Sequence, residues 1–268
     1  MTGLSPLRMK ALPERAMNYA GLVEYDGTDF AGWAIQPGFR TVEGTLVEAL
    51  ETILRQPVKL TVAGRTDAGV HSSGQVVSFR VQTDLSPASI SYRATALLPK
   101  DLALRRCEAV EEDFDARRDA RTRSYEYRVI NNPIRSPLER RRAIHVARKL
   151  NLDLLREAAD LVRGVHDFRA FTPAKTHHVR FTRVVEESSW ERRDGLLIYR
   201  ITANSFLYGM VRALVGTMLE VAEGKRKVAE FARLLSGGGR SEAGPAAPAR
   251  GLTLVNVRYE NLNFEGMP

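Results

Sequence analysis

The sequence Gly64-Arg65-Thr66-Asp67-Ala68-Gly69-Val70-His71 lies between two runs in which apolar and polar residues alternate. The apolar positions are Val58, Leu60 and Val62 before it and Val77, Phe79 and Val81 after it. Alternation with a period of two is typical of half-buried strands, so the eight residues are predicted to form a loop between two strands. Gly64 and Gly69 permit backbone turns, and they enclose one carboxylate, Asp67, beside one cation, Arg65.

Two interpretations of Asp67 are open at this level. Its carboxylate can accept hydrogen bonds from the amides of its own loop, as in an Asx-turn. It can instead carry chemistry, if later segments of the chain bring suitable side chains to it. Two later residues, Arg212 and Tyr125, are candidates for such a role.

Arg212 falls inside the apolar run 206–223, which predicts a helix. A cation in such a helix must either reach solvent or meet an anion. On helical spacing its neighbours are Tyr208 and Gly216, which indicates a partly open face that could line a cleft. If Arg212 meets Asp67, that carboxylate is expected to stay ionised with a lowered pKa. Pairing with another acid, or exposure to solvent, is the alternative.

Tyr125 belongs to a predicted strand at 124–130, where it shares one face with Tyr127 and Val129. Core packing is the ordinary role of such a tyrosine. Tyr125 also follows an arginine-rich segment, and an aromatic ring beside cations is suited to stacking a base and holding the adjoining phosphates. The arginine-rich segments consist of Arg117, Arg118, Arg121 and Arg123 and of residues 140–142. These arginines are interpreted either as solvated surface or as a track that binds phosphates.

The composition narrows the class of protein. The 268 residues include 40 Lys and Arg against 32 Asp and Glu, a formal net charge of +8, which favours a polyanionic partner such as nucleic acid. The single cysteine, Cys107, excludes an intrachain disulfide, and the five histidines, including His177 and His178, lack the spacing of a metal site. Dinucleotide and P-loop motifs are also missing, which argues against a bound dinucleotide or a P-loop nucleotide. Because an apolar span of membrane length is missing too, we expect a cytoplasmic protein.

The predicted elements alternate between strands and helices throughout the chain. Strands are expected at 19–25, 58–62, 77–81, 102–110, 124–130, 183–190, 196–203 and 252–260, with Asp194-Gly195 as a hairpin turn and 236–251 as a surface loop. Helices are expected at 41–56, where Thr41 is the cap, at 206–223 and at 228–235. Another is expected to open at Ser86-Pro87 with Ile90, Ala94 and Leu97 facing inward, and another to begin at Asn151 or Asp153 and stop near Gly164. This order predicts an α+β fold with two halves, each a mixed or antiparallel sheet with helices packed on one face. The polar segment 111–123 marks the boundary, so the predicted divisions are a basic extension at 1–16, a first half at 17–114 that carries Asp67, and a second half at 115–268.

Residues 64–71 resemble the active-site motif of the tRNA pseudouridine synthase A family. Further segments resemble that family in the same order, and they are 24–28, 32–33, 114–117, 123–128, 166–171, 203–206, 210–212 and 251–254. Together they extend from about Tyr19 to Tyr259. Ala34 and Glu43 depart from the pattern, because many members carry glutamines there.

The resemblance implies an enzyme that isomerises uridine to pseudouridine in the anticodon stem-loop of tRNA, without metal or cofactor. It implies that Asp67 is the catalytic residue, that Tyr125 stacks on the base and that Arg212 pairs with Asp67. Arg65 is implied to enter the RNA helix as the target nucleotide leaves it. The implied architecture is two α+β halves around a basic central cleft, in a homodimer.

Two other classes of function are alternatives to this one. A non-catalytic RNA-binding or RNA-folding protein on the same scaffold would fit the positive charge and the aromatic face equally well, but it has no use for an acid such as Asp67. A cofactor-free hydrolase would need a second acid or a histidine at motif spacing, and the sequence offers neither.

Overall fold

The computed structural model describes residues 16–176 and 179–264, which form an α+β fold on one mixed sheet. The strands are β1 Met17–Tyr25, β2 Thr61–Val62, β3 His71–Val81, β4 Leu102–Val110, β5 Thr122–Ile130, β6 Ile144–His145, β7 Gly164–Asp167, β8 Thr182–Arg193, β9 Leu196–Ala203 and β10 Leu252–Arg258. The α-helices are α1 Val42–Leu54, α2 Pro87–Leu97, α3 Leu152–Val162, α4 Met210–Ala222 and α5 Val228–Leu234.

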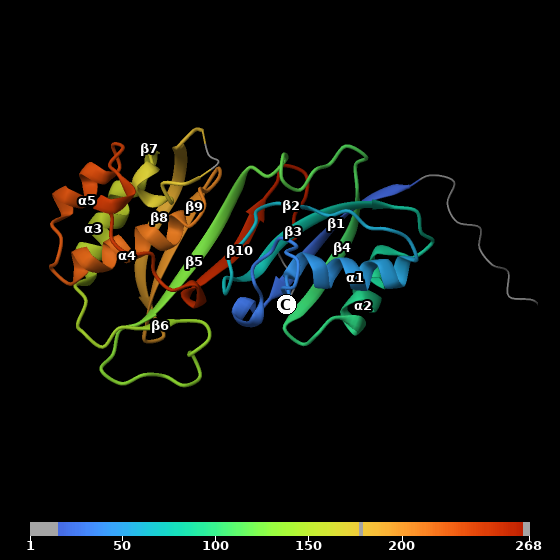
Figure 1. Cartoon of the computed structure of the whole chain (residues 1–268), viewed down its shortest axis with the longest axis horizontal. Helices are drawn as coiled ribbons and strands as arrows, with labels where there is room; N and C mark the ends of the chain where they lie inside the picture. The colour runs from blue at the N-terminus through green and yellow to red at the C-terminus, as the bar shows by residue number, and fades with distance from the viewer. Residues whose placement is uncertain (1–15, 177–178, 265–268) are drawn as a thin grey trace, which may run out of the picture.

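The sheet is continuous from one end of the molecule to the other. Its strand order is β4-β1-β3-β10-β5-β9-β8-β7, with β2 added to β3 and β6 added to β5. Strand β10 is the last in the chain, yet it lies between β3 and β5, parallel to the first and antiparallel to the second (Figure 1). The predicted α+β class is confirmed, but the expectation of a separate sheet in each half is wrong, because β10 joins them.

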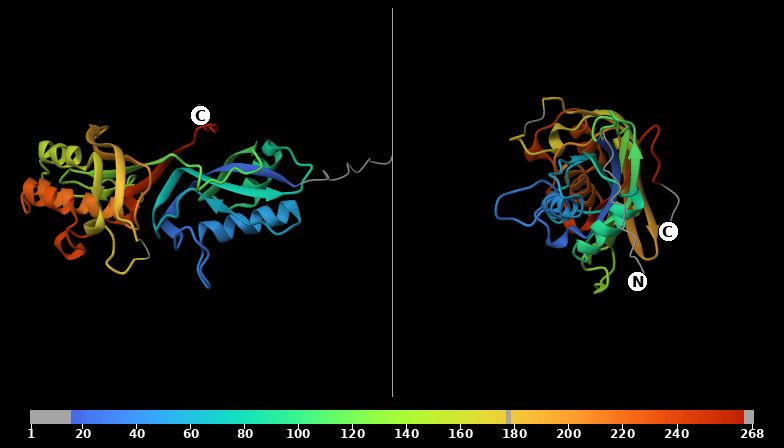
Figure 2. Two further views of the ribbon diagram at one scale, coloured as in Figure 1. Left: turned by 90° about the horizontal axis from the view of Figure 1, so that it is seen from above. Right: turned by 90° about the vertical axis from the view of Figure 1, so that its right-hand side faces the viewer.

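The helices form two groups at opposite ends of an elongated molecule (Figure 1 and Figure 2). Helices α1 and α2 pack on the part of the sheet formed by β1, β3 and β4, and α3, α4 and α5 pack near β8 and β9. Two clusters of buried apolar side chains correspond to these groups. One contains residues between Tyr19 and Cys107, and the other consists mostly of residues between Ala116 and Tyr259. Each cluster buries the apolar stripe of its own helices against the sheet.

Local sequence signals set most of the element ends. The side chains of Thr41, Ser86 and Asn151 accept backbone N–H groups at the starts of α1, α2 and α3, as N-cap residues do. Asp194 and Gly195 join β8 to β9 with φ values of 51° and 79°, the two positive angles that a tight hairpin turn requires. The caps at Thr41 and Ser86 and the hairpin turn are confirmed, and of the two starts left open for α3, Asn151 and Asp153, the structure shows Asn151. Cys107 is buried in β4.

Three local predictions need correction. Helix α4 begins at Met210 and not at 206, because Gly209 adopts the left-handed conformation (φ 68°) and breaks the helical run. Leu97 was expected to face inward but is 54% exposed, since it ends α2 and the next residue, Leu98, packs inward instead. His71 belongs to β3 and not to the loop, so the loop spans 63–70. Among the described residues, no helix combines the length and apolar character needed to cross a membrane.

Candidate active site

Strand β10 brings the loop of Asp67 close to Tyr125. Leu254 of β10 is in register with Ser72 of β3 on one side and with Tyr125 of β5 on the other. Neighbouring strands lie about 4.8 Å apart, so Ser72 and Tyr125 are separated by about 10 Å. Because the loop 63–70 runs directly into β3, Asp67 is held at the same place on the sheet as Tyr125.

Arg212 reaches this place from the first turn of α4. Its Nη1 donates a hydrogen bond to Asp67 Oδ2 at 3.0 Å, and its Nε donates to the carbonyl oxygen of Ala247 at 2.8 Å. The backbone N–H of Ala247 in turn donates to the carbonyl of Arg212 at 2.9 Å. Of the alternatives that the sequence left open for Asp67 and Arg212, the structure shows the ion pair between them.

The pKa of Asp67 shifts in the direction opposite to the one predicted from the sequence. Burial raises the pKa of the Asp67 carboxyl above its ordinary value, and the charge and hydrogen bond of Arg212 offset only part of that rise. The predicted lowering of this pKa is therefore wrong. Only 16% of the Asp67 side chain and 24% of the Arg212 side chain are exposed. The cost of removing the Asp67 carboxylate from water therefore outweighs its attraction to the guanidinium of Arg212.

The segment before β10, which the sequence suggested was a surface loop, holds Arg212 in place. Gly216 of α4 lies against the backbone of Pro245, where an added Cβ would be 1.7 Å from the Pro245 carbonyl oxygen. Two residues further on, Ala247 binds Arg212. The predicted open face is therefore confirmed for Arg212 and Tyr208, which line the cavity described below, but not for Gly216, which allows the close approach that positions Ala247.

Gly216→Ala tests this close approach. Replacing glycine by alanine inside a helix ordinarily stabilises it by about 0.5–1 kcal/mol, but here the new methyl group must displace backbone. We expect the free energy of unfolding to fall by about 1–3 kcal/mol, as measured by urea denaturation. The matched control is Gly44→Ala in α1, whose nearest contact would be a side-chain oxygen at 3.0 Å. A Gly216→Ala protein as stable as the parent would contradict the packing described.

A cavity of about 420 Å³ opens above the ion pair, within the range of sites for small ligands. Its described lining contains four arginines and a single carboxylate, Asp67. Arg65 and Arg117 are exposed there, and their guanidinium groups make no hydrogen bond or ion pair with another described residue. The cavity therefore presents two available cations around one buried acid.

Tyr125 forms part of the cavity wall and is 8% exposed. The Phe206 ring meets it edge to face, with ring centroids 4.9 Å apart, and so fixes its orientation. Burial raises the pKa of the Tyr125 phenol far above its ordinary value, with a further contribution from the negative charge of Asp67. The hydroxyl is therefore neutral at physiological pH, and the ring offers an apolar surface to a ligand.

Arg123 is buried, so it belongs neither to the solvated surface nor to the phosphate track, the two roles that the sequence suggested. It is 8% exposed, and its guanidinium donates five hydrogen bonds to the backbone carbonyls of Ala63, Arg117, Ala120 and Asn204. A guanidinium has five N–H groups, so all of them are used and none remains for a phosphate. Arg123 instead ties together the three backbone segments that surround the cavity.

A buried hydrogen-bond network beneath the Asp67 loop was also missed by the sequence analysis. The Gln75 side chain, which is fully buried, donates to the Gly64 carbonyl at 2.7 Å and to the Tyr25 hydroxyl at 3.4 Å. That hydroxyl is 2.8 Å from Thr66 Oγ1. The alternating pattern of β3 could have shown that Gln75 faces inward, but not what it binds.

His71 fastens the other end of the loop. Its Nδ1 accepts the Gly27 N–H at 3.1 Å, so its Nε2, 3.1 Å from the Arg250 carbonyl, acts as the donor. Among the remaining arginines of the predicted phosphate track, Arg118 pairs with Asp119, Arg121 with Glu260 and Arg141 with Asp29. Arg140 donates to the Pro137 carbonyl, and Arg142 is exposed.

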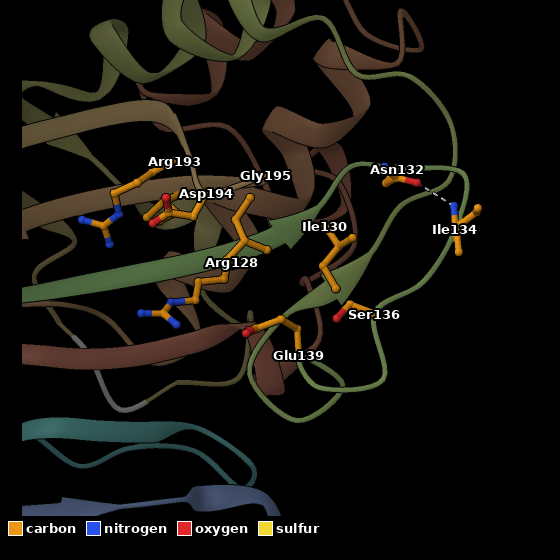
Figure 3. Close-up of a pocket in the computed structure, with 11 residues that line it drawn as sticks. Arg128, Ile130, Asn132, Ile134, Ser136, Glu139, Arg193, Asp194 and Gly195 are labelled. Atoms are coloured by element: carbon orange, nitrogen blue, oxygen red, sulfur yellow. Dashed lines mark hydrogen bonds between the residues drawn. The ribbon is translucent and has the colours of Figure 1, made fainter.

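A larger cavity of about 610 Å³ lies near the turn between β8 and β9 (Figure 3). Its lining includes Arg128, Glu139, Arg193 and Asp194, and the Asn132 side chain accepts the Ile134 N–H at 2.8 Å where the 131–143 segment folds back. None of its described lining residues comes from the Asp67 loop or from α4. The smaller cavity, where an acid, an arginine and an aromatic ring meet, is therefore the candidate active site.

No group of three His, Cys, Asp or Glu side chains within residues 16–176 and 179–264 is arranged to hold a metal ion. His177 and His178, which the sequence analysis considered, lie outside the described residues.

A buried acid paired with an arginine, beside an aromatic wall and exposed cations, is an arrangement suited to an enzyme that acts on a polyanion. The family described as "tRNA pseudouridine synthase" matches residues 22–119 and 158–260. Proteins named "tRNA pseudouridine synthase A" are similar over most of the chain. The one from Acetivibrio thermocellus is 37% identical over 238 residues, covering 89% of this chain and 98% of the relative. That from Halalkalibacterium halodurans is 38% identical over 245 residues, covering 89% and 93%.

The chain belongs to the tRNA pseudouridine synthase A family, and it is an isomerase of that class. A solved structure described as "Crystal Structure of a Cbf5-Nop10-Gar1 Complex" aligns with a TM-score of 0.32 and 14% identity, covering 88% of this chain and 57% of that one. A structural similarity at this level carries no weight beside the sequence relatives.

Proposed function

We propose that this enzyme converts uridine to pseudouridine in the anticodon stem-loop of tRNA, with Asp67 as its catalytic residue. The observation that carries the proposal is the pair between Asp67 and Arg212 at the base of an arginine-lined cavity, next to the Tyr125 ring. Incubating the purified protein with tRNA tritiated at uracil C5 should release tritium, because the new bond forms at that carbon. Mass spectrometry of the same tRNA then maps the altered uridine.

The reaction breaks the N-glycosidic bond, turns the uracil and rebonds it through C5. The target base must first leave its stack, which costs a few kcal/mol. Stacking on Tyr125 recovers about 1–3 kcal/mol. Arg65 fills the gap left in the RNA, a role that its exposure at the cavity supports. Asp67 then acts either as the nucleophile or as the base that takes a ribose proton. Both routes need its ionised form.

Arg212→Met tests how Asp67 is kept ionised. Removing the guanidinium leaves the effect of burial unopposed, so the pKa of Asp67 rises further. Because the ionised form is the active one, we expect the acid limb of the kcat/KM profile to move to higher pH, with activity partly recovering as pH rises. Arg65→Ala is the control, expected to lower kcat/KM without moving the limb. An unchanged profile for Arg212→Met would count against the pair.

Tyr125→Phe and Tyr125→Leu separate the ring from the hydroxyl. Since the phenol is neutral and the ring is the proposed contact, the Phe variant should bind RNA and turn over almost as the parent does. The Leu variant loses the aromatic face, and its kcat/KM should fall by about 10- to 100-fold. Normal binding with slow turnover in the Phe variant would show instead that the hydroxyl transfers a proton.

The architecture implied by the family completes the proposal. We propose that residues 17–114 and 115–268 act as two halves around a basic central cleft, which the separate apolar clusters and the arginine-lined cavity support. We propose further a cytoplasmic homodimer, for which light scattering should give about twice the chain mass of 29.9 kDa. Most of the proposed basic extension, residues 1–15, lies outside the described residues.

A further inference from the structure

Tyr208 stands at the rim of the same cavity, and its ring has no place in the reaction outlined above. It is 60% exposed, whereas Tyr125 in the same wall is 8% exposed. Exposed aromatic rings are common singly on protein surfaces. This one shares a cavity with two cations, Arg65 and Arg117, that are available to bind phosphates. Its position relative to them makes it a candidate contact for RNA.

The backbone that carries Tyr208 is fixed on both sides. Its carbonyl accepts the hydroxyl of Thr172, a residue that is 1% exposed, at 2.9 Å. The Leu207 carbonyl accepts the Met210 N–H at 3.2 Å, and the left-handed Gly209 turns the chain into α4. A ring on an anchored backbone loses little conformational freedom when a ligand packs against it. These contacts hold the backbone of Tyr208 in one position, so the ring offers a fixed surface for stacking.

Extraction of a nucleotide leaves its neighbours in the RNA without one stacking partner. A protein ring beside the extracted nucleotide can replace that partner, and stacking of this kind tolerates any base. We propose that Tyr208 stacks on the base of a nucleotide adjacent to the one bound against Tyr125. This inference rests on the proposed function, because it needs a uridine in the cavity, and it extends it by a second base-binding position at the rim.

The test uses anticodon stem-loop RNA and three variants of the full chain. Tyr208→Ala removes the ring, Tyr208→Phe keeps it, and Tyr92→Ala is a matched control at a 79% exposed tyrosine on α2. We expect the Tyr208→Ala protein to bind the RNA about 10- to 100-fold more weakly. The Tyr208→Phe and Tyr92→Ala proteins should bind as the parent does. A Tyr208→Ala protein with the parent's dissociation constant would overturn the proposal.

RNAs with an abasic site identify the stacked base. One RNA lacks the base on the 5′ side of the target uridine, and a second lacks the base on the 3′ side. On one of the two, Tyr208→Ala should cause no further loss of binding, because its stacking partner is already missing. An equal loss on both abasic RNAs would overturn the contact with a neighbouring base. Tritium release by the parent protein reports separately on the proposed function, so a failure of that function is distinguished from a failure of the Tyr208 contact.

Discussion

Asp67→Asn is expected to abolish pseudouridine formation while leaving RNA binding close to that of the parent. The substitution keeps the shape of the side chain and one hydrogen-bond acceptor for Arg212, but it removes the negative charge that both proposed routes require. We expect the rate of tritium release to fall by about 10⁴-fold or more. Filter binding of the same RNA should change little, since the contacts proposed for Tyr125 and Arg65 are intact.

The control for this prediction is Asp29→Asn. Asp29 is an exposed acid that pairs with Arg141 outside the cavity, so its loss should leave tritium release unchanged. An Asp67→Asn protein with appreciable activity would show that the charge of Asp67 is not needed, and the mechanism would have to be abandoned. Loss of binding together with activity would point instead to a structural role.

Arg123→Met is expected to cause the largest loss of stability. It removes five hydrogen bonds and leaves four backbone carbonyls without their partner in the interior. Each buried carbonyl that loses its donor costs about 1–3 kcal/mol, so we expect the loss of four to lower the free energy of unfolding by about 4 kcal/mol or more. Arg123→Lys should recover only part, because an ammonium has three donors and no planar fork.

Arg118→Met is the matched control, on the same arginine-rich segment. Arg118 is 62% exposed and pairs with Asp119, and such surface pairs contribute about 0–1 kcal/mol. Urea denaturation of the three variants measures the difference directly. If Arg123→Met were no less stable than Arg118→Met, the carbonyls around the cavity would have found other partners and Arg123 would not be a structural clamp.

Patterns within a few neighbouring residues were sufficient to predict most of the helices, strands and turns. The caps at Thr41, Ser86 and Asn151 and the Asp194-Gly195 turn follow from the preferences of single residues. The alternation in β5 correctly placed Tyr125 on an inner face. The start of α4 was predicted too early because the apolar run already begins at Phe206. The left-handed backbone of Gly209 shows that the helix begins only after that residue.

The sequence by itself determined the family, through the 64–71 motif and the ordered segments around it, and it named the three residues that meet in the cavity. Only the tertiary structure decided how they meet. Arg212 and Asp67 are 145 residues apart, and their contact depends on β10 entering the sheet between β3 and β5 and on Ala247 holding the guanidinium.

Burial explains both why the pKa of Asp67 is raised and why Arg123 binds backbone carbonyls instead of solvent or phosphate. Burial is the sum of contacts from many distant segments, whereas charge, spacing and periodicity are properties of adjacent residues. A sequence can therefore show that an acid and an arginine are present. How much water the fold removes from each is decided only when the sheet and helices pack around them.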